Sequence, residues 1–256
     1  AFTLLSPHAG AAGQAYDWNG PAENQPITGG VDLNGDGYDD LVWGMPNYGV
    51  NCGGYPECAR AKNGGVMVYL GREPQDPRLT QVSCTPDLTL TGAPGAQLGF
   101  SVAPVGDLDA DGCDEVAISA PGARLWDGLV YVLLGHGPNC ARLGPEVITL
   151  ATDNISAVLG WSVAGGGDLD GDGLADLAIS APYAILDNTR RGAVEVVRGA
   201  TLREAILAGH VTPLIDAMVP DDMNAVVLDM RFDSPRTIWG EETSIVVGGD
   251  PRWTYP

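Results

Sequence analysis

An all-β fold is predicted by three features of the sequence: abundant turn-forming residues, short apolar runs between them, and a repeated unit. The 256 residues include 36 glycines and 19 prolines, a composition that suits short strands and tight turns better than long helices. An apolar content of 45% is sufficient for a substantial core. The longest uninterrupted apolar run, Leu129 to Leu134, is far shorter than the roughly 20 residues of a membrane-spanning helix. We therefore expect a soluble protein that does not insert into a membrane.

The repeated unit occurs three times. The two clearest copies start at Leu98 and Leu159. Each contains a Leu-Gly-aromatic-Ser-Val segment, an acidic loop, an apolar run that ends in Ser-Ala-Pro, and a valine-rich run that ends in glycine. Another copy, at 32–71, lacks the leading aromatic segment and carries an insertion around Cys52 to Lys62. A unit that recurs every few tens of residues is typical of a solenoid, a propeller or an array.

Four short strands are expected in each unit. The first strand precedes the acidic loop, the second follows it, and the third is the valine-rich run. The second strands are predicted at Leu41 to Gly44, Val116 to Ser119 and Leu177 to Ser180, and fourth strands at Asp87 to Leu90 and Val147 to Leu150. Four antiparallel strands per unit at this spacing are typical of a β-propeller blade. Because one blade cannot cover its own two faces, neighbouring blades must stack.

We expect one propeller domain, at 1–256, of about four blades. The blades are predicted at about 26–91, about 98–151 and about 159–217, with a degenerate fourth at about 223–256 plus 1–5. In the fourth blade, Ala225 to Met230 and Ser244 to Val247 are predicted strands, but the acidic loop is lost. The N-terminal strand, Ala1 to Leu5, would complete this blade within one chain or between two chains as a homodimer. Alternatively, the chain is a piece of a longer propeller.

One helix is predicted, at Thr201 to Ala208. Thr201 and Glu204 have the spacing of a capping box, and Gly209 can adopt the left-handed conformation that ends a helix.

The acidic loops have the pattern Asp, x, Asp or Asn, x, Asp, Gly, x, x, Asp or Glu. Calcium takes six to eight oxygen ligands, and alternate residues of a tight loop can turn their side-chain oxygens toward one centre. Backbone carbonyls would supply the seventh position, where the residue type varies freely. The expected ligands are Asp32, Asn34, Asp36, Tyr38 and Asp40; Asp107, Asp109, Asp111, Cys113 and Glu115; and Asp168, Asp170, Asp172, Leu174 and Asp176. We therefore expect Ca²⁺ as the cofactor, with three sites, and coupling between calcium binding and folding.

The pattern of these loops departs from that of an EF-hand. An EF-hand begins in the same way but needs a glutamate at position twelve, where these loops have Trp43, Ile118 and Ile179 in an apolar strand. A single loop of this kind could also be a solvated acidic turn, but three in register favour metal sites.

The repeats resemble the FG-GAP repeats of the integrin α-subunit propeller. Gly99-Phe100 supplies the FG motif and Gly160-Trp161 a close variant, and the GAP motif is matched by Ser119-Ala-Pro121, Ser180-Ala-Pro182 and Gly44-Met-Pro46. The resemblance covers about Ile27 to Gly199. It implies a β-propeller with calcium loops on one face and partner binding on the opposite face. Integrin propellers have seven blades, so the full ligand-binding surface of that family cannot be assumed here.

Five cysteines allow two disulfides. Cys52 and Cys58 bracket a short flexible span, and Cys84 and Cys140 occupy comparable places before fourth strands, which would leave Cys113 without a partner. Buried reduced cysteines are the alternative. Calcium loops of low affinity favour a calcium-rich space, so we expect a secreted or cell-surface protein.

A binding module is expected rather than an enzyme. The charge of −20 argues against nucleic acid or an anionic membrane as partner. Only His8, His136 and His210 could serve as histidine bases, and no catalytic motif surrounds them. A protein ligand and a role in adhesion are predicted. The alternatives are the non-catalytic propeller of a secreted hydrolase, or a lectin that binds glycans through exposed aromatic residues. Candidates for the latter are Tyr16, Trp18, Trp126, Tyr183, Trp239 and Trp253.

Overall fold

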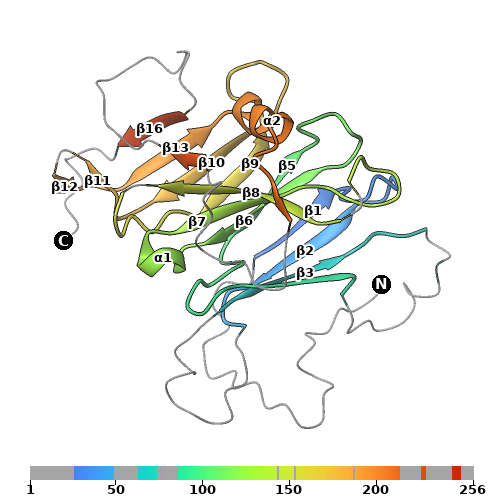
Figure 1. Cartoon of the computed structure of the whole chain (residues 1–256), viewed down its shortest axis with the longest axis horizontal. Helices are drawn as coiled ribbons and strands as arrows, with labels where there is room; N and C mark the ends of the chain where they lie inside the picture. The colour runs from blue at the N-terminus through green and yellow to red at the C-terminus, as the bar shows by residue number, and fades with distance from the viewer. Residues whose placement is uncertain are drawn as a thin grey trace, which may run out of the picture.

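The computed structural model describes residues 26–48, 63–73, 76, 86–142, 144–152, 154–186, 188–213, 226–228 and 244–248. In these ranges the chain forms three successive, mainly antiparallel sheets and one small hairpin (Figure 1). The first sheet contains β1 (Ile27–Val31), β2 (Asp40–Met45), β3 (Gly65–Tyr69) and β4 (Leu88–Thr91). The second contains β5 (Val102–Gly106), β6 (Glu115–Ala120), β7 (Leu129–Leu133) and β8 (Glu146–Thr152). The third contains β9 (Val163–Gly167), β10 (Asp176–Ala181), β13 (Ala193–Val197) and β16 (Ser244–Gly248).

Each sheet is a propeller blade, and the first two have their four strands in chain order. The predicted all-β, β-propeller fold is therefore confirmed. The second, third and fourth strands predicted for the first two blades all form, with bounds that differ from the prediction by at most a few residues.

The middle blade is buried on both faces, which explains the apolar run Leu129 to Leu134. Successive side chains of a strand point to opposite faces. Leu129, Tyr131 and Leu133 belong to the core shared with the first blade. Val130, Val132 and Leu134 belong to the core shared with the third blade. A strand covered on both faces needs apolar residues at every position rather than at alternate ones.

The Leu-Gly-aromatic segments join one blade to the next. Leu98 forms a parallel bridge with Gly64 of the first blade, and Leu159 forms the same bridge with Gly128 of the second. The N–H groups of Gly99 and Gly160 then donate to the carbonyl oxygens of the serines in the two Ser-Ala-Pro motifs, at 2.9 Å in both cases. The Leu-Gly-aromatic segment and the Ser-Ala-Pro motif are separated by a fixed number of residues because they contact each other in both of these repeats.

A pair of glycines allows the first two blades to approach closely. A Cβ atom added to Gly44 would lie 2.2 Å from the carbonyl oxygen of Gly99. Gly99 itself has φ +78, a conformation that favours glycine. The first blade therefore needs Gly44 at the position that a serine occupies in the two Ser-Ala-Pro motifs.

The C-terminal strands extend existing sheets. The sequence places Ser244 to Val247 in a fourth blade, but β16 pairs with β13 as the outer strand of the third sheet. Two short strands, β14 (Thr212–Pro213) and β15 (Val226–Leu228), both pair with β8 of the second blade. The segment 1–5, expected to complete the fourth blade, lies outside the described residues, and the blade bounds therefore stay a prediction.

The predicted helix forms at α2 (Gly199–Leu207), directly after β13. Its N-cap is Arg198 and no side chain caps it, so the predicted capping box is wrong: Thr201 and Glu204 lie inside the helix. Gly209 has φ +76 and ends the helix as expected. The segment α1 (Ala123–Trp126) is a tight turn with left-handed residues, and β11 (Ile185–Leu186) and β12 (Thr189–Arg190) form a small hairpin. Among the described residues, no helix has the length and apolar character needed to span a membrane.

Candidate metal centres

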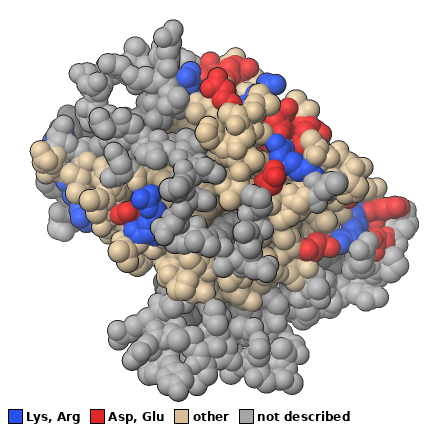
Figure 2. Space-filling model, viewed as in Figure 1, with Lys and Arg blue, Asp and Glu red and all other residues tan. Residues whose placement is uncertain are grey.

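The three acidic loops connect the first and second strands of the blades. They lie between β1 and β2, between β5 and β6, and between β9 and β10. Figure 1 places these hairpin ends along one edge of the molecule, and Figure 2 shows acidic side chains in separate clusters along that edge, with basic side chains beside them. The loops are therefore neighbours in space as well as repeats in sequence.

The first aspartate of each loop organises the backbone in the same way. The Oδ2 atoms of Asp32, Asp107 and Asp168 accept hydrogen bonds from the N–H of the sixth loop residue, a glycine, at 2.7, 3.1 and 2.9 Å. These glycines, Gly37, Gly112 and Gly173, have φ between +83 and +89, a conformation that favours glycine. The loop reverses direction at this residue.

The third acidic position closes a smaller turn. In each loop its Oδ1 atom accepts the N–H of the residue two positions later, which pairs Asp36 with Tyr38, Asp111 with Cys113 and Asp172 with Leu174. The seventh residue, whose carbonyl is the expected ligand, is thereby held in a fixed orientation.

The last carboxylate of each loop is buried and holds the loop against the rest of its blade. The buried residues are Asp40, Glu115 and Asp176. One carboxylate oxygen accepts an N–H from the second residue of the loop, at 2.7–2.8 Å. The other accepts an N–H from a glycine beyond the third strand, at 2.7, 3.3 and 2.9 Å. The residue predicted to close the metal site is thus also the anchor of the loop.

The glycines that bind these anchors have a steric role as well. A Cβ atom on Gly71, Gly135 or Gly199 would lie within 2.8 Å of backbone or side-chain atoms of the loop. The glycine that ends each valine-rich run is therefore needed for close contact with the loop, a role that the repeat pattern alone does not indicate.

Burial raises the pKa of two anchors. The pKa of Asp40 rises to about 6 and that of Glu115 to about 8, because burial disfavours the charged carboxylate and neighbouring aspartates repel it, although backbone N–H donors act in the opposite direction. A bound cation would favour the charged form of both groups.

Carboxylates converge in two of the loops. Asp107, Asp109 and Asp111 each offer an oxygen within 4.8 Å of the others, and so do Asp168, Asp170 and Asp176. Among the described acidic residues of the first loop, no such trio forms, and Asn34 has the place of the second aspartate. The Asn34 amide instead bonds to Asp36 within the loop.

An arginine lies in the second cluster. Nη1 of Arg142 is 2.8 Å from Oδ2 of Asp109 and 3.4 Å from Oδ2 of Asp111. Burial disfavours the arginine charge, but the hydrogen bond to Asp109 and the surrounding carboxylates outweigh this effect and raise the pKa of Arg142. No sequence motif points to Arg142, which lies 31 residues beyond Asp111 on the connection from β7 to β8.

A disulfide joins Cys113 to Cys140, with a Cα–Cα distance of 5.8 Å. The predicted pair of Cys84 and Cys140 is therefore wrong, and so is the expectation that Cys113 has no partner. The prediction compared positions along successive blades, whereas the β7–β8 connection folds back over the second loop and brings Cys140 to Cys113. Cys52, Cys58 and Cys84 lie outside the described residues.

The first and second loops are linked directly. The N–H of Asp32 donates to Oδ2 of Asp114 and the N–H of Asp114 donates to the carbonyl oxygen of Asp32, both at 2.8 Å. The N–H of His136 donates to the carbonyl oxygen of Leu33 at 2.7 Å. Asp114 is at the eighth loop position, which is outside the ligand pattern, so its role in joining two blades was not predicted.

The third loop is more open. Asp168 is fully exposed, and backbone N–H donors, first Gly173 and then Gly171, lower its pKa. The nearest ion pair is weak, since Nη1 of Arg198 is 3.9 Å from Oδ2 of Asp170. The third cluster is thus held by a longer ion pair than the second, where Arg142 is 2.8 Å from Asp109.

Three segments, 27–69, 98–133 and 159–197, match the FG-GAP repeat family. They contain the first three strands of each blade and all three acidic loops. The chain is thus a β-propeller built from FG-GAP repeats.

Mouse integrin alpha-IIb is 30% identical over 210 residues, which are 81% of this chain and 18% of that protein. Integrin alpha-5 of Xenopus laevis is 34% identical over 157 residues, 59% of this chain and 14% of that protein. Rat phosphatidylinositol-glycan-specific phospholipase D is 32% identical over 177 residues, 66% of this chain and 20% of that protein. The chain therefore contains an FG-GAP, integrin-alpha-like domain and spans at most a fifth of the length of these relatives.

Proposed function

We propose that this propeller is a calcium-binding extracellular module that binds a protein partner, and that calcium rigidifies the first hairpin of each blade. The observation that carries the proposal is the threefold repetition of one loop geometry, with the same backbone hydrogen bonds to the first, third and last acidic residues. Side chains of the loops offer mainly carboxylate and amide oxygens, which suit a hard cation such as calcium and do not suit zinc or copper.

One ion per loop is proposed. Its ligands would be the side-chain oxygens at positions one, three, five and nine and the carbonyl oxygen at position seven, from Asp32, Asn34, Asp36, Tyr38 and Asp40 in the first loop and the matching residues in the others. The exposed aspartates at position one supply charge, and the buried anchors fix the loop. A chain of net charge −20 gains stability from cations bound where its carboxylates converge.

The proposed location is the cell exterior. A disulfide is typical of secreted and surface proteins because cytosolic thiols are kept reduced. The acidic loops and a disulfide that joins one of them to the β7–β8 connection support the same compartment.

The proposed partner is a protein that binds at the ends of the strands opposite to the acidic loops, as the integrin-alpha resemblance implies. Adhesion is the role that this resemblance favours. If one chain does not close the ring, a homodimer or a longer parent chain with further blades would close it. The molar mass measured by light scattering with calcium distinguishes a monomer from a homodimer.

The second candidate is the non-catalytic propeller of a secreted hydrolase, favoured by the similarity to phosphatidylinositol-glycan-specific phospholipase D. We propose that the propeller itself is not catalytic. Of the two histidines that the structure describes, His210 is exposed after α2 and His136 contacts the carbonyl oxygen of Leu134 through Nδ1. Neither lies in a carboxylate trio.

Isothermal titration of the chelator-treated chain with calcium tests the proposal. We expect one ion per loop and a higher unfolding temperature with calcium. Asp109→Ala should remove or weaken one site and leave the others. A Cys113→Ala, Cys140→Ala double variant retains the backbone carbonyl at position 113, so it should still bind calcium in the second loop. Binding of one ion or none would contradict the proposal.

A further inference from the structure

A hollow of about 540 Å³ lies at the seam of the first two blades. It is lined by the connection from β4 to β5, at 93–97, and by the turn after β6, at 122–126. The second acidic loop precedes β6 and the hollow follows it, so the two lie at opposite ends of that strand. No residue of the proposed calcium sites contributes to it, and the inference drawn from it goes beyond the proposed function.

The two walls are fixed against each other. The N–H of Gly122 donates to the carbonyl oxygen of Ala96 at 3.1 Å. A Cβ atom on Gly122 would lie 2.1 Å from the carbonyl oxygen of Gly95. The width of the hollow is thus set by direct backbone contact at its base.

The outer wall is also fixed to the third blade. The carbonyl oxygen of Trp126 accepts the N–H of Val158 at 3.0 Å, and Oδ1 of Asp127 accepts the N–H of Ser156 at 2.7 Å. The turn that carries Trp126 is therefore held from both sides.

This turn has a costly backbone conformation. Arg124, Leu125 and Trp126 have φ of 51, 60 and 76, and Gln97 on the facing wall has φ of 56. Residues with a Cβ atom rarely adopt such angles, and they keep them where the surroundings over-determine the conformation, which is common at binding sites. The result is that Leu125 is 90% exposed and Trp126 is 50% exposed.

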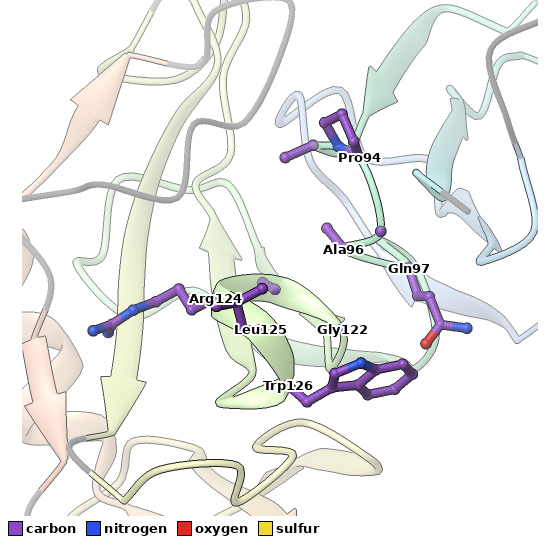
Figure 3. A pocket seen from close by; sticks show the side chains of 10 residues that line it. Pro94, Ala96, Gln97, Gly122, Arg124, Leu125 and Trp126 are labelled. Carbon is purple, nitrogen blue, oxygen red and sulfur yellow. The ribbon is translucent and has the colours of Figure 1, made fainter. Parts of the chain in front are cut away.

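The hollow offers an aromatic ring and an unused hydrogen-bond acceptor. Oε1 of Gln97 is buried and has no hydrogen-bond partner within the described part of the chain. Figure 3 shows the indole of Trp126 extending toward Gln97, whereas the side chain of Arg124 extends away from both. The other wall residues are small, namely Ala93, Pro94, Gly95, Ala96, Gly122 and Ala123. A ligand here meets an apolar ring and a neutral acceptor but no charge.

We propose that this hollow binds one sugar residue of a glycan, with its C–H face on the indole of Trp126 and a hydroxyl that donates to Oε1 of Gln97 once rotation of the Gln97 side chain exposes this buried atom. The face of an aromatic ring is negative and attracts the weakly positive C–H groups of a pyranose. A buried acceptor without a partner costs free energy, which a ligand hydroxyl recovers. An ionic ligand would find no counter-charge on these walls.

The test is saturation-transfer NMR and calorimetry of the calcium-loaded chain with a panel of methyl glycosides of mannose, galactose, glucose and N-acetylglucosamine. We expect at least one glycoside to bind. Trp126→Ala should weaken that binding by about tenfold or more, because the loss of an aromatic stack and its buried area costs at least one factor of ten. Alanine keeps a Cβ atom, so the backbone strain of the turn stays the same.

Two further variants separate ligand contact from folding. Gln97→Met keeps the length of the side chain and removes its acceptor, so it should weaken the same glycoside by about fivefold, the value of one hydrogen bond. Trp161→Ala is the matched control, since Trp161 is 46% exposed but stacks on Phe100 outside the hollow. Calcium stoichiometry should be the same in all three variants.

The proposal is overturned if no glycoside of the panel binds, or if Trp126→Ala and Trp161→Ala bind equally well. It is also overturned if apolar peptides bind to the hollow in a Trp126-dependent manner and glycosides do not, because the site would then be a protein contact.

Discussion

The second and third acidic loops share a motif and the backbone hydrogen bonds to its first, third and last acidic residues, yet their surroundings differ. In the second loop, the side chains of Asp109 and Asp111 are 8% and 9% exposed and share Arg142, and a disulfide fixes the seventh residue. In the third loop, Asp170 is 17% exposed, its arginine is 3.9 Å away, and Asp168 is fully exposed. One motif therefore produces a loop whose carboxylates share a close arginine and a loop whose nearest ion pair is longer.

The largest expected effect comes from removing the covalent link of the second loop. Its cysteines are separated by 27 residues, so a Cys113→Ser, Cys140→Ser variant should lose about 2–4 kcal/mol of unfolding free energy. Calcium affinity should fall in the second loop and stay the same in the third. Urea unfolding and calcium titration measure both quantities, and an equal loss in the two loops would contradict the comparison.

Calcium removal should affect the third loop more than the second. Without an ion, the carboxylates at 168–176 repel one another and their ion pair to Arg198 is long, whereas Arg142 and the disulfide still hold the second loop. Hydrogen exchange in chelator should therefore rise by about tenfold more at 169–175 than at 108–114, a difference of about 1.4 kcal/mol in local opening. If exchange rises equally in both loops, the second loop is not held by its own contacts.

Replacing Arg142 and Arg198 one at a time should show how differently the two loops depend on their arginines. Arg142 would compete with the proposed calcium ion for Asp109 and Asp111, so Arg142→Ala should increase the calcium affinity of the second loop by several-fold to about tenfold. Arg198→Ala is the matched control, and it should change the affinity of the third loop by less than about threefold, because an ion pair at this distance is weak. A loss of affinity in Arg142→Ala would mean that the arginine supports the site instead of competing for it.

A pH dependence of the calcium-free chain is also expected. The pKa of Glu115 is raised from 4.5 to about 8, so the folded state binds a proton that the unfolded state releases. The contribution of Glu115 to the free energy of unfolding should fall as the pH rises from about 4.5 to about 8. Urea unfolding in chelator should show this slope, and Glu115→Gln should remove that part of it. Asp40, whose pKa is also raised, gives a slope of the same sign at lower pH. The contribution of Glu115 is therefore the difference between the slope of the original protein and that of Glu115→Gln.

Most of the fold could be predicted because its determinants are local. Loop, strand and turn motifs recur at constant offsets, and the positive φ of Gly112 and its equivalents follows from the loop pattern. The apolar run at Leu129 already contained the information that the middle blade is covered on both faces.

Most of the errors concern contacts between residues that are distant in sequence. Cys140 and Arg142 reach the second loop only because the β7–β8 connection folds over it, and no local pattern encodes that path. The partner of β16 is also not encoded locally, since a short apolar strand can extend any open sheet edge. The helix start was misplaced because Thr201 and Glu204 fit a capping pattern while the preceding strand already fixed the helix at Gly199.

The reciprocal bonds between Asp32 and Asp114 have a consequence for how ions are taken up. A backbone N–H of each loop donates a hydrogen bond to the other loop. An ion that orders one loop therefore lowers the conformational entropy that the other loop loses when it binds its own ion. With an ion in each loop as proposed, the first two sites would be thermodynamically linked, with each ion favouring the next. Among the described residues, no such reciprocal pair of bonds joins the third loop to the second. Ion uptake by this propeller would be a cooperative pair plus an event without this link, divided at the seam between the second and third blades.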